Sequence, residues 1–151
     1  MLQYEAKGDD RMIVICVIDD HGGMLFNHRR QSQDRVLREH ILQRTHNKKL
    51  WMNTYSYGQF AAEQAPQIVV SEQFLHEVAA GDFCFVETCS LAEVEPRIEA
   101  FILYRWNRSY PTDFYLNLTL TQPHWTQIET TDFAGNSHER ITEEIYIPAK
   151  K

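Results

Sequence analysis

Hydrophobic residues occur along the chain in short continuous runs that alternate with stretches of helical spacing. Residues 12–19, MIVICVID, are apolar and rich in β-branched residues, which is typical of a strand buried on both faces of a sheet. A helix is expected to follow to about residue 46, with Ser32 as its N-cap and apolar positions at helical spacing. The alternation continues with strands at 49–55, 67–70, 83–88 and 100–106 and helices at 58–65, 72–80 and 91–99. Ser71 is expected to cap the second of these helices, and Pro96 to shorten the third.

Strands that alternate with helices predict a mostly parallel sheet with helices on both of its faces. After residue 107 the pattern changes, and residues 113–120, 125–133 and 141–147 have strand composition with polar turns between them. These segments predict an antiparallel end to the same sheet. No repeat or linker divides the chain, so we expect a single α/β domain over residues 1–151, with 1–11 as a flexible or peripheral extension.

Composition excludes several classes of protein. The chain has 151 residues, 43% hydrophobic and 24% charged, and no apolar run is long enough to span a bilayer. The N-terminal stretch lacks the apolar core of a secretory signal, so we expect a cytoplasmic protein. Cys16, Cys84 and Cys89 lack CxxC spacing and are expected to be reduced and mostly core residues. The seven histidines show no metal-ligand spacing, so no metal site is expected.

Charge is distributed unevenly along the chain. The net charge is −6, yet residues 29–49 contain seven basic and only two acidic residues. Such a stretch can be a solvated helix face, or it can bind an anionic small molecule, a phosphate group or nucleic acid. The candidate ligand-binding residues are four of the five arginines of this stretch and two aromatic residues, namely Arg29, Arg30, Arg35, Arg38, Tyr55 and Trp106.

Several strings resemble, in the same order, those of the dihydrofolate reductase family, over nearly all of the chain after residue 11. The first strand is followed by DDHGGM at 19–24, in the place of that family's acidic residue and glycine-containing loop. Asp34 comes next, near a helix start, and IVVS at 68–71 ends a strand in Ser. TDFYL at 112–116 is similar to the family's Asp-Thr-aromatic-Phe string. The resemblance implies a three-layer, dihydrofolate-reductase-like fold.

Positions that match the family's NADPH site carry other residues. The resemblance places that site at Gly22, Gly23, Thr54, Ser56, Ser71 and Thr88. The family's phosphate-binding turn, Gly-Arg-(Lys/His)-Thr, corresponds to NTYS at 53–56, and a phosphate-binding Arg corresponds to Glu72. Its Gly-Gly pair corresponds to Glu87 and Thr88. A carboxylate and a β-branched residue hinder the approach of an anionic pyrophosphate, so this site is expected to be degenerate.

Asp34 matches the acid that, in the family, holds the pterin ring and supports its protonation, which implies a catalytic role for it. A second interpretation is structural, because an Asp in the first turn of a helix complements the helix dipole and can pair with Arg38. Arg35 and Arg38 stand where the family has apolar or aromatic contacts with the pterin. His138 is expected to be structural.

Three hypotheses on function follow. The first is a dihydrofolate-reductase-like binding or accessory protein for an anionic ligand or nucleotide, without standard NADPH-dependent reduction and with no cofactor. Nucleic acid is a weaker candidate partner in this hypothesis. The second is an active NADPH-dependent pterin reductase with Asp34 as proton-relay acid. The third is a protein-interaction module in which the basic helix meets an acidic partner.

Overall fold

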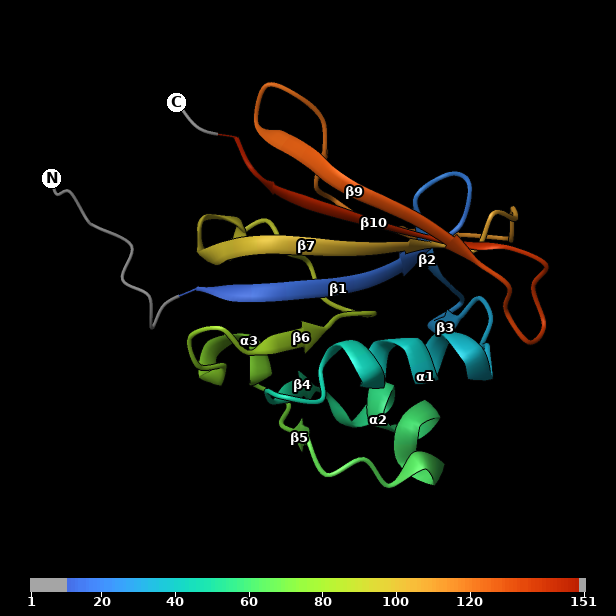
Figure 1. Cartoon of the computed structure of the whole chain (residues 1–151), viewed down its shortest axis with the longest axis horizontal. Coiled ribbons are helices and arrows are strands. Elements are labelled where there is room, and N and C mark those ends of the chain that lie inside the picture. The colour runs from blue at the N-terminus through green and yellow to red at the C-terminus, as the bar shows by residue number, and fades with distance from the viewer. Residues whose placement is uncertain (1–10, 150–151) are drawn as a thin grey trace, which may run out of the picture.

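A seven-stranded sheet forms the centre of the computed structural model, which describes residues 11–149 (Figure 1). The strand order is β5-β4-β6-β1-β7-β10-β9. Pairings from β5 to β7 are parallel, whereas β10 pairs antiparallel with β7 and β9, which confirms the predicted mixed sheet. Its strands are β1 (Met12–Ile18), β4 (Leu50–Met52), β5 (Ile68–Val70), β6 (Phe83–Phe85), β7 (Ile98–Arg105), β9 (Trp125–Phe133) and β10 (Ile141–Pro148).

A second, three-stranded sheet is made by β3 (Arg29–Arg30), β2 (Gly23–Phe26) and β8 (Phe114–Tyr115). The predicted strand at 113–120 is therefore wrong for most of its length, and its paired part joins β2 rather than the main sheet. The leucines at 116, 118 and 120 do pack against the core, which explains the alternating pattern. The segment beyond Tyr115 has no partner strand in the described structure, because apolar alternation alone does not supply one.

Helices cover both faces of the main sheet, as the alternating pattern predicted. They are α1 (Arg35–Arg44), α2 (Thr54–Phe60) and α3 (Phe74–Glu77), with 3₁₀ helices at Ala61–Glu63 and Glu95–Arg97. Alternate residues of β1 serve the two faces, since Ile15 packs in the cluster of α1 and α2 and Val14 in that of α3. Both clusters are buried, and they form the core.

Three helix boundaries differ from the sequence prediction. Asp34, not Ser32, caps α1, because its carboxylate accepts hydrogen bonds from the amides of Val36 and Leu37. The helix expected at 58–65 begins at Thr54, since Asn53 caps it through the amide of Ser56. The helix expected at 91–99 is reduced to a 3₁₀ turn that contains Pro96.

The predicted cap of α3 is also corrected. The N-cap position is Gln73, which makes no side-chain capping bond, and the hydroxyl of Ser71 accepts instead from the amide of Gln73 before the helix begins. The helix is one turn long, shorter than expected, because Val78 already has extended backbone angles.

The cysteines are free, as predicted: Cys16 and Cys84 are buried in the core and Cys89 is half-buried. No helix within residues 11–149 is long and apolar enough to cross a membrane. The predicted extension at 1–11 lies outside the described residues except for Arg11.

Candidate functional site

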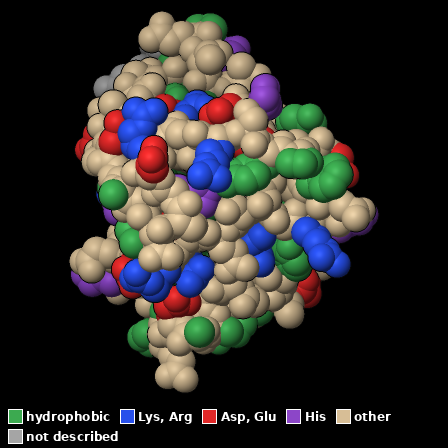
Figure 2. Space-filling model, turned by 90° about the vertical axis from the view of Figure 1, so that its right-hand side faces the viewer, with side chains coloured by type: hydrophobic (Ala, Val, Ile, Leu, Met, Phe, Trp, Pro, Cys, Tyr) green, Lys and Arg blue, Asp and Glu red, His purple; other side chains and the backbone are tan. Residues whose placement is uncertain are grey.

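The turns that matched a nucleotide site lie along one edge of the main sheet. β5, β4, β6 and β1 are neighbouring parallel strands, so their carboxyl ends meet at the same edge. Ser71, Asn53, Glu87 and Asp19 follow these strands in the sequence. Open α/β sheets bind ligands at such an edge. Figure 2 views the molecule from the side toward which β1 and β6 run, and basic and acidic side chains lie next to one another on it.

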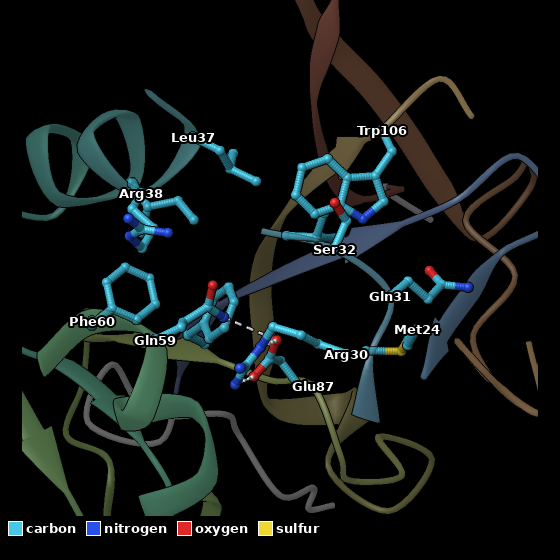
Figure 3. Close-up of a pocket in the computed structure, with 13 residues that line it drawn as sticks. Met24, Arg30, Gln31, Ser32, Leu37, Arg38, Gln59, Phe60, Glu87 and Trp106 are labelled. Atoms are coloured by element: carbon cyan, nitrogen blue, oxygen red, sulfur yellow. Dashed lines mark hydrogen bonds and ion pairs between the residues drawn. The ribbon is translucent and has the colours of Figure 1, made fainter. Parts of the chain in front are cut away.

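The centre of this edge is occupied by an ion pair between Arg30 of β3 and Glu87, which follows β6 (Figure 3). Arg30 Nε lies 3.0 Å from Glu87 Oε2, and Arg30 Nη2 lies 3.0 Å from Oε1. The carboxylate also accepts hydrogen bonds from Ser56 Oγ at 2.8 Å and from Gln59 Nε2 at 3.0 Å. The four donors join β3 and α2 to the end of β6, so the pair closes the edge between these elements.

Both members of the pair are largely withdrawn from solvent, with side chains 15% and 11% exposed. Burial alone would lower the pKa of Arg30, but the hydrogen bonds and charge of Glu87 raise it, so the guanidinium stays cationic. The cavity beside the pair is also lined by Gln31, Ser32 and Trp106 and has a volume of about 20 Å³. That volume has room for about one or two water molecules and not for a bicyclic ring.

A second carboxylate occupies the start of α2. Glu72 Oε2 accepts a hydrogen bond from the amide of Thr54 at 2.8 Å and another from the Thr54 hydroxyl. These hydrogen bonds lower the pKa of Glu72, which is solvent-exposed. The amides at a helix start are the donors that an anionic ligand would use. At α2 the protein's own carboxylate already accepts from Thr54.

The positions that the resemblance assigned to a cofactor are therefore filled by contacts within the protein. Ser56 and Thr54 bind Glu87 and Glu72, and Thr88 Oγ1 accepts from Asn53 Nδ2 at 2.9 Å. The hydroxyl of Ser71 donates to Glu77. None of these four hydroxyls is left without a protein partner.

The two glycines, Gly22 and Gly23, form the tight turn between β1 and β2. Gly22 has a φ of 80°, and a Cβ on Gly23 would overlap the side chain of Thr112. The amide of Gly23 donates to Asp19 Oδ1 at 2.8 Å.

Asp19 is buried and ties this turn to the chain after β7. Its carboxylate accepts from the amide of Tyr110 and the hydroxyl of Thr112, both at 3.1 Å, and from Gln31 Nε2 at 3.1 Å. Burial alone would raise the pKa of Asp19, but these hydrogen bonds lower it. Asp19 thus fastens the base of the β2–β3 hairpin to the main sheet.

The predicted cluster of arginines is mostly neutralised by neighbouring carboxylates. Arg38 Nε lies 3.1 Å from Glu63 Oε2, which corrects the expected pairing of Arg38 with Asp34. Arg35 pairs with Glu39 on the exposed face of α1. Arg29 is exposed and has no acidic partner within residues 11–149.

The two aromatic candidates lie apart from each other. The Tyr55 ring lies under the Arg30 guanidinium, 4.5 Å from its centroid, and the Tyr55 hydroxyl accepts from the Arg30 amide at 2.8 Å. Trp106 is buried on the opposite wall of the cavity and stacks on His138, with ring centroids 4.3 Å apart. Tyr55 thus contacts Arg30 of the ion pair, and Trp106 packs against a separate polar cluster around His138.

Asp34 lies in that cluster and does not line the cavity. Its buried carboxylate accepts from the amides of Asn136 and Ser137, at 2.9 and 2.8 Å, in addition to the first amides of α1. Burial alone would raise the pKa of Asp34, but these hydrogen bonds, together with that from His138, lower it well below its usual range. As placed, the carboxylate holds the β9–β10 turn to α1, and its proposed catalytic role stays a prediction.

His138 is a residue whose position the sequence did not suggest. Its Nδ1 lies 3.1 Å from Asp34 Oδ2, and its Nε2 lies 2.8 Å from the Tyr110 hydroxyl and 3.3 Å from Ser32 Oγ. No spacing signal could have indicated this, because Asp34 and His138 are 104 residues apart in the chain. Within residues 11–149, no group of three His, Cys, Asp or Glu residues is placed to hold a metal ion.

Comparison with known proteins bears on the fold. No family model and no curated protein matches the sequence. A solved structure of dihydrofolate reductase from Enterococcus faecalis, complexed with NADP(H) and RAB-propyl, matches with a TM-score of 0.67. The match covers 94% of this chain and 98% of that one at 9% sequence identity. The chain has a dihydrofolate-reductase-like fold. At this identity the likeness extends to the fold alone. The contacts of Glu87 with Arg30 and of Glu72 with Thr54 are described from this chain only.

Proposed function

We propose that this protein is a binding or accessory protein for an anionic small molecule or nucleotide, without standard NADPH-dependent reductase activity. One observation carries the proposal: carboxylates of the chain occupy the donors that an anionic cofactor would need. Glu72 accepts from Thr54 at the start of α2, and Glu87 accepts from Arg30, Ser56 and Gln59.

A pyrophosphate would have to displace both carboxylates and would then lie beside two negative charges. Repulsion between unit charges about 4 Å apart is on the order of 1 kcal/mol in water and about 4 kcal/mol near a protein surface. Displacing Glu87 would also leave the half-buried Arg30 without its partner unless the ligand replaced it. Standard NADPH binding is therefore unfavourable at this edge.

An anionic ligand has a better position beside Arg29. This arginine has no acidic partner within the described part of the chain, and with Phe26, Asn27, Arg30 and Tyr110 it lines a surface depression of about 430 Å³. Phe26 is exposed, so its ring offers an apolar surface beside a cation. A flat anionic molecule can combine these two contacts, whereas nucleic acid would need several unpaired cations.

A thermal-shift titration tests the proposal, because a ligand that binds only the folded state raises the Tm. Ligands to compare are NADPH, NADP, dihydrofolate, methotrexate and a panel of mononucleotides, each at low and moderate salt. We expect no shift with NADPH or NADP, and a salt-sensitive shift with at least one anion of the panel. Arg29→Glu should abolish that shift, and Arg35→Glu, in an exposed pair on α1, should preserve it.

A shift of several degrees with NADPH would overturn the proposal. It would return the reductase with Asp34 as proton-relay acid to first place, which NADPH oxidation in the presence of dihydrofolate would then check. An anion-dependent shift unaffected by Arg29→Glu would refute the assigned position.

A further inference from the structure

Ser32 lines the cavity beside the Arg30–Glu87 pair and lies within hydrogen-bond distance of His138, which in turn lies within hydrogen-bond distance of Asp34. Asp34 Oδ2 is 3.1 Å from His138 Nδ1, and His138 Nε2 is 3.3 Å from Ser32 Oγ. A carboxylate on one ring nitrogen and a hydroxyl on the other form the arrangement that activates serine nucleophiles in acyl transfer. The triad is recognised by geometry and roles and not by order along the chain.

His138 and Asp34 are buried, whereas Ser32 can be reached from the cavity. The side chains of His138 and Asp34 are 2% and 0% exposed, whereas Ser32 is partly exposed and lines the cavity. The His138 ring is held in place by stacking on Trp106, at 4.3 Å between centroids and 20° between planes. A molecule in the cavity can thus reach the imidazole through the hydroxyl of Ser32.

The hydrogen bonds also fix which nitrogen is basic. An ionised Asp34 carboxylate can only accept, so in the neutral ring the hydrogen belongs on His138 Nδ1, and the lone pair on Nε2 faces the hydroxyls of Ser32 and Tyr110. Ser137 Oγ lies 3.1 Å from Nδ1, on the side that carries the hydrogen, and His138 cannot take its proton there. Ser32 is the serine that lies both on the basic nitrogen and at the cavity.

We propose that Ser32 is a nucleophile, with His138 as its general base and Asp34 as the residue that orients His138, and that the protein hydrolyses esters of small acyl groups. This activity is independent of the anion binding proposed above. It uses the Asp34 carboxylate as an acceptor of hydrogen bonds, which agrees with its six contacts.

The reaction needs no further reactant besides water. Ser32 Oγ forms a bond to the acyl carbon as His138 Nε2 takes its proton, and the carbonyl electrons move onto oxygen. These electrons return as the ester C–O bond breaks, and the alcohol leaves with the proton from Nε2. Water then attacks the acyl-serine, gives a proton to Nε2, and releases the acid while the proton returns to Ser32 Oγ.

The cavity sets the class of acyl group. Its volume of about 20 Å³ excludes long or branched chains and favours an acetyl-sized group, with the alcohol portion outside. Arg38 and Arg30 line the same cavity and are paired with Glu63 and Glu87, so they would offer guanidinium N–H donors, and not unpaired positive charge, to the oxyanion that develops on the carbonyl.

Hydrolysis of p-nitrophenyl acetate and labelling by a fluorophosphonate probe test the proposal on the full chain. We expect the probe to label Ser32, as located by peptide mass spectrometry. Ser32→Ala and His138→Gln should each lower the kcat/KM of hydrolysis by about 100-fold or more. Ser90→Ala removes a hydroxyl that accepts from Asn117 Nδ2 and from the backbone N–H of Ala92, and should keep both the hydrolysis and the labelling.

Ser32 is partly exposed, so its alanine variant should melt within about 2 °C of the unmodified protein, and lost activity then cannot be ascribed to unfolding. Tyr110 is the alternative nucleophile, because its hydroxyl also lies within hydrogen-bond distance of His138 Nε2. Labelling at Tyr110 or Cys89 would refute the proposal. So would hydrolysis that survives Ser32→Ala, or an absence of both labelling and hydrolysis in the unmodified protein.

Discussion

Removal of one member of the Arg30–Glu87 pair should destabilise the protein far more than removal of one member of an exposed pair. Breaking a buried ion pair on one side costs about 3–5 kcal/mol, and breaking an exposed pair costs about 0–1 kcal/mol. With side chains 15% and 11% exposed, this pair lies nearer the buried limit. We therefore expect Arg30→Met to lower the free energy of unfolding by about 2–3 kcal/mol, discounted for the remaining solvent contact.

Urea unfolding and a thermal melt measure this effect. For a chain of this length, 2–3 kcal/mol corresponds to a fall in Tm of about 4–12 °C. The matched control is Arg35→Met, because the side chains of Arg35 and Glu39 are 54% and 57% exposed and the change should stay within about 0.5 kcal/mol.

A double-mutant cycle separates the pair from its surroundings. Glu87→Met alone leaves Arg30 charged without its carboxylate, and Arg30→Met alone leaves Glu87 with Ser56 and Gln59 only. The double variant removes both charges, so it should be more stable than the sum of the single effects by about 2 kcal/mol. Additive effects, or an Arg30→Met effect no larger than that of Arg35→Met, would refute the reasoning.

Three further predictions concern acid stability, backbone freedom and thiol reactivity. Because its pKa is lowered, ionised Asp34 stabilises the fold above the unfolded-state pKa of about 3.9, and this stabilisation is progressively lost as the pH falls below that value. The Tm of Asp34→Asn should therefore fall less between pH 5 and 3 than the Tm of the unmodified protein. Gly58→Ala in α2, where a Cβ meets open space, should stabilise by about 0.5–1 kcal/mol in urea, and Gly22→Ala, at a φ of 80°, should destabilise by about 1 kcal/mol. At pH 8 a disulfide reagent should react rapidly with one thiol of the folded protein, Cys89, because Cys16 and Cys84 are buried and burial raises the pKa of Cys84 to about 12. Rapid reaction of all three thiols would contradict the burial of Cys16 and Cys84 in the core.

Continuous apolar runs made the parallel sheet predictable. Residues 12–18 are all apolar, so a strand made of them is stable only where both of its faces are buried, at the centre of a sheet. β1 lies there, between β6 and β7. The segment 113–120 has the alternation of a strand, but its leucines pack on the core without a ladder. A partner strand is a property of the whole fold, and the local pattern cannot specify it.

The sequence could suggest individual candidate residues but not their contacts. The resemblance placed Glu87 and Glu72 where the family has glycine and arginine at an anion site, because one position each was enough for that inference, and this assignment stays a prediction. Their neutralising partners were not seen, since Arg30 is 57 residues from Glu87. A run of basic residues likewise does not reveal that Arg30, Arg35 and Arg38 each face a carboxylate. Charge counted along a chain overstates the charge available to a ligand.

The β2–β3 hairpin is fastened at two places, by Asp19 at its base and by Arg30 at the end of β3. A loop held in this way has little freedom to swing over a molecule in the cavity. A ligand that takes the place of Glu87 on Arg30 must therefore wait for this contact to open, a step whose rate does not depend on ligand concentration. Association followed by stopped flow should consequently level off at a plateau as ligand is increased, and the plateau value would be the opening rate of the ion pair.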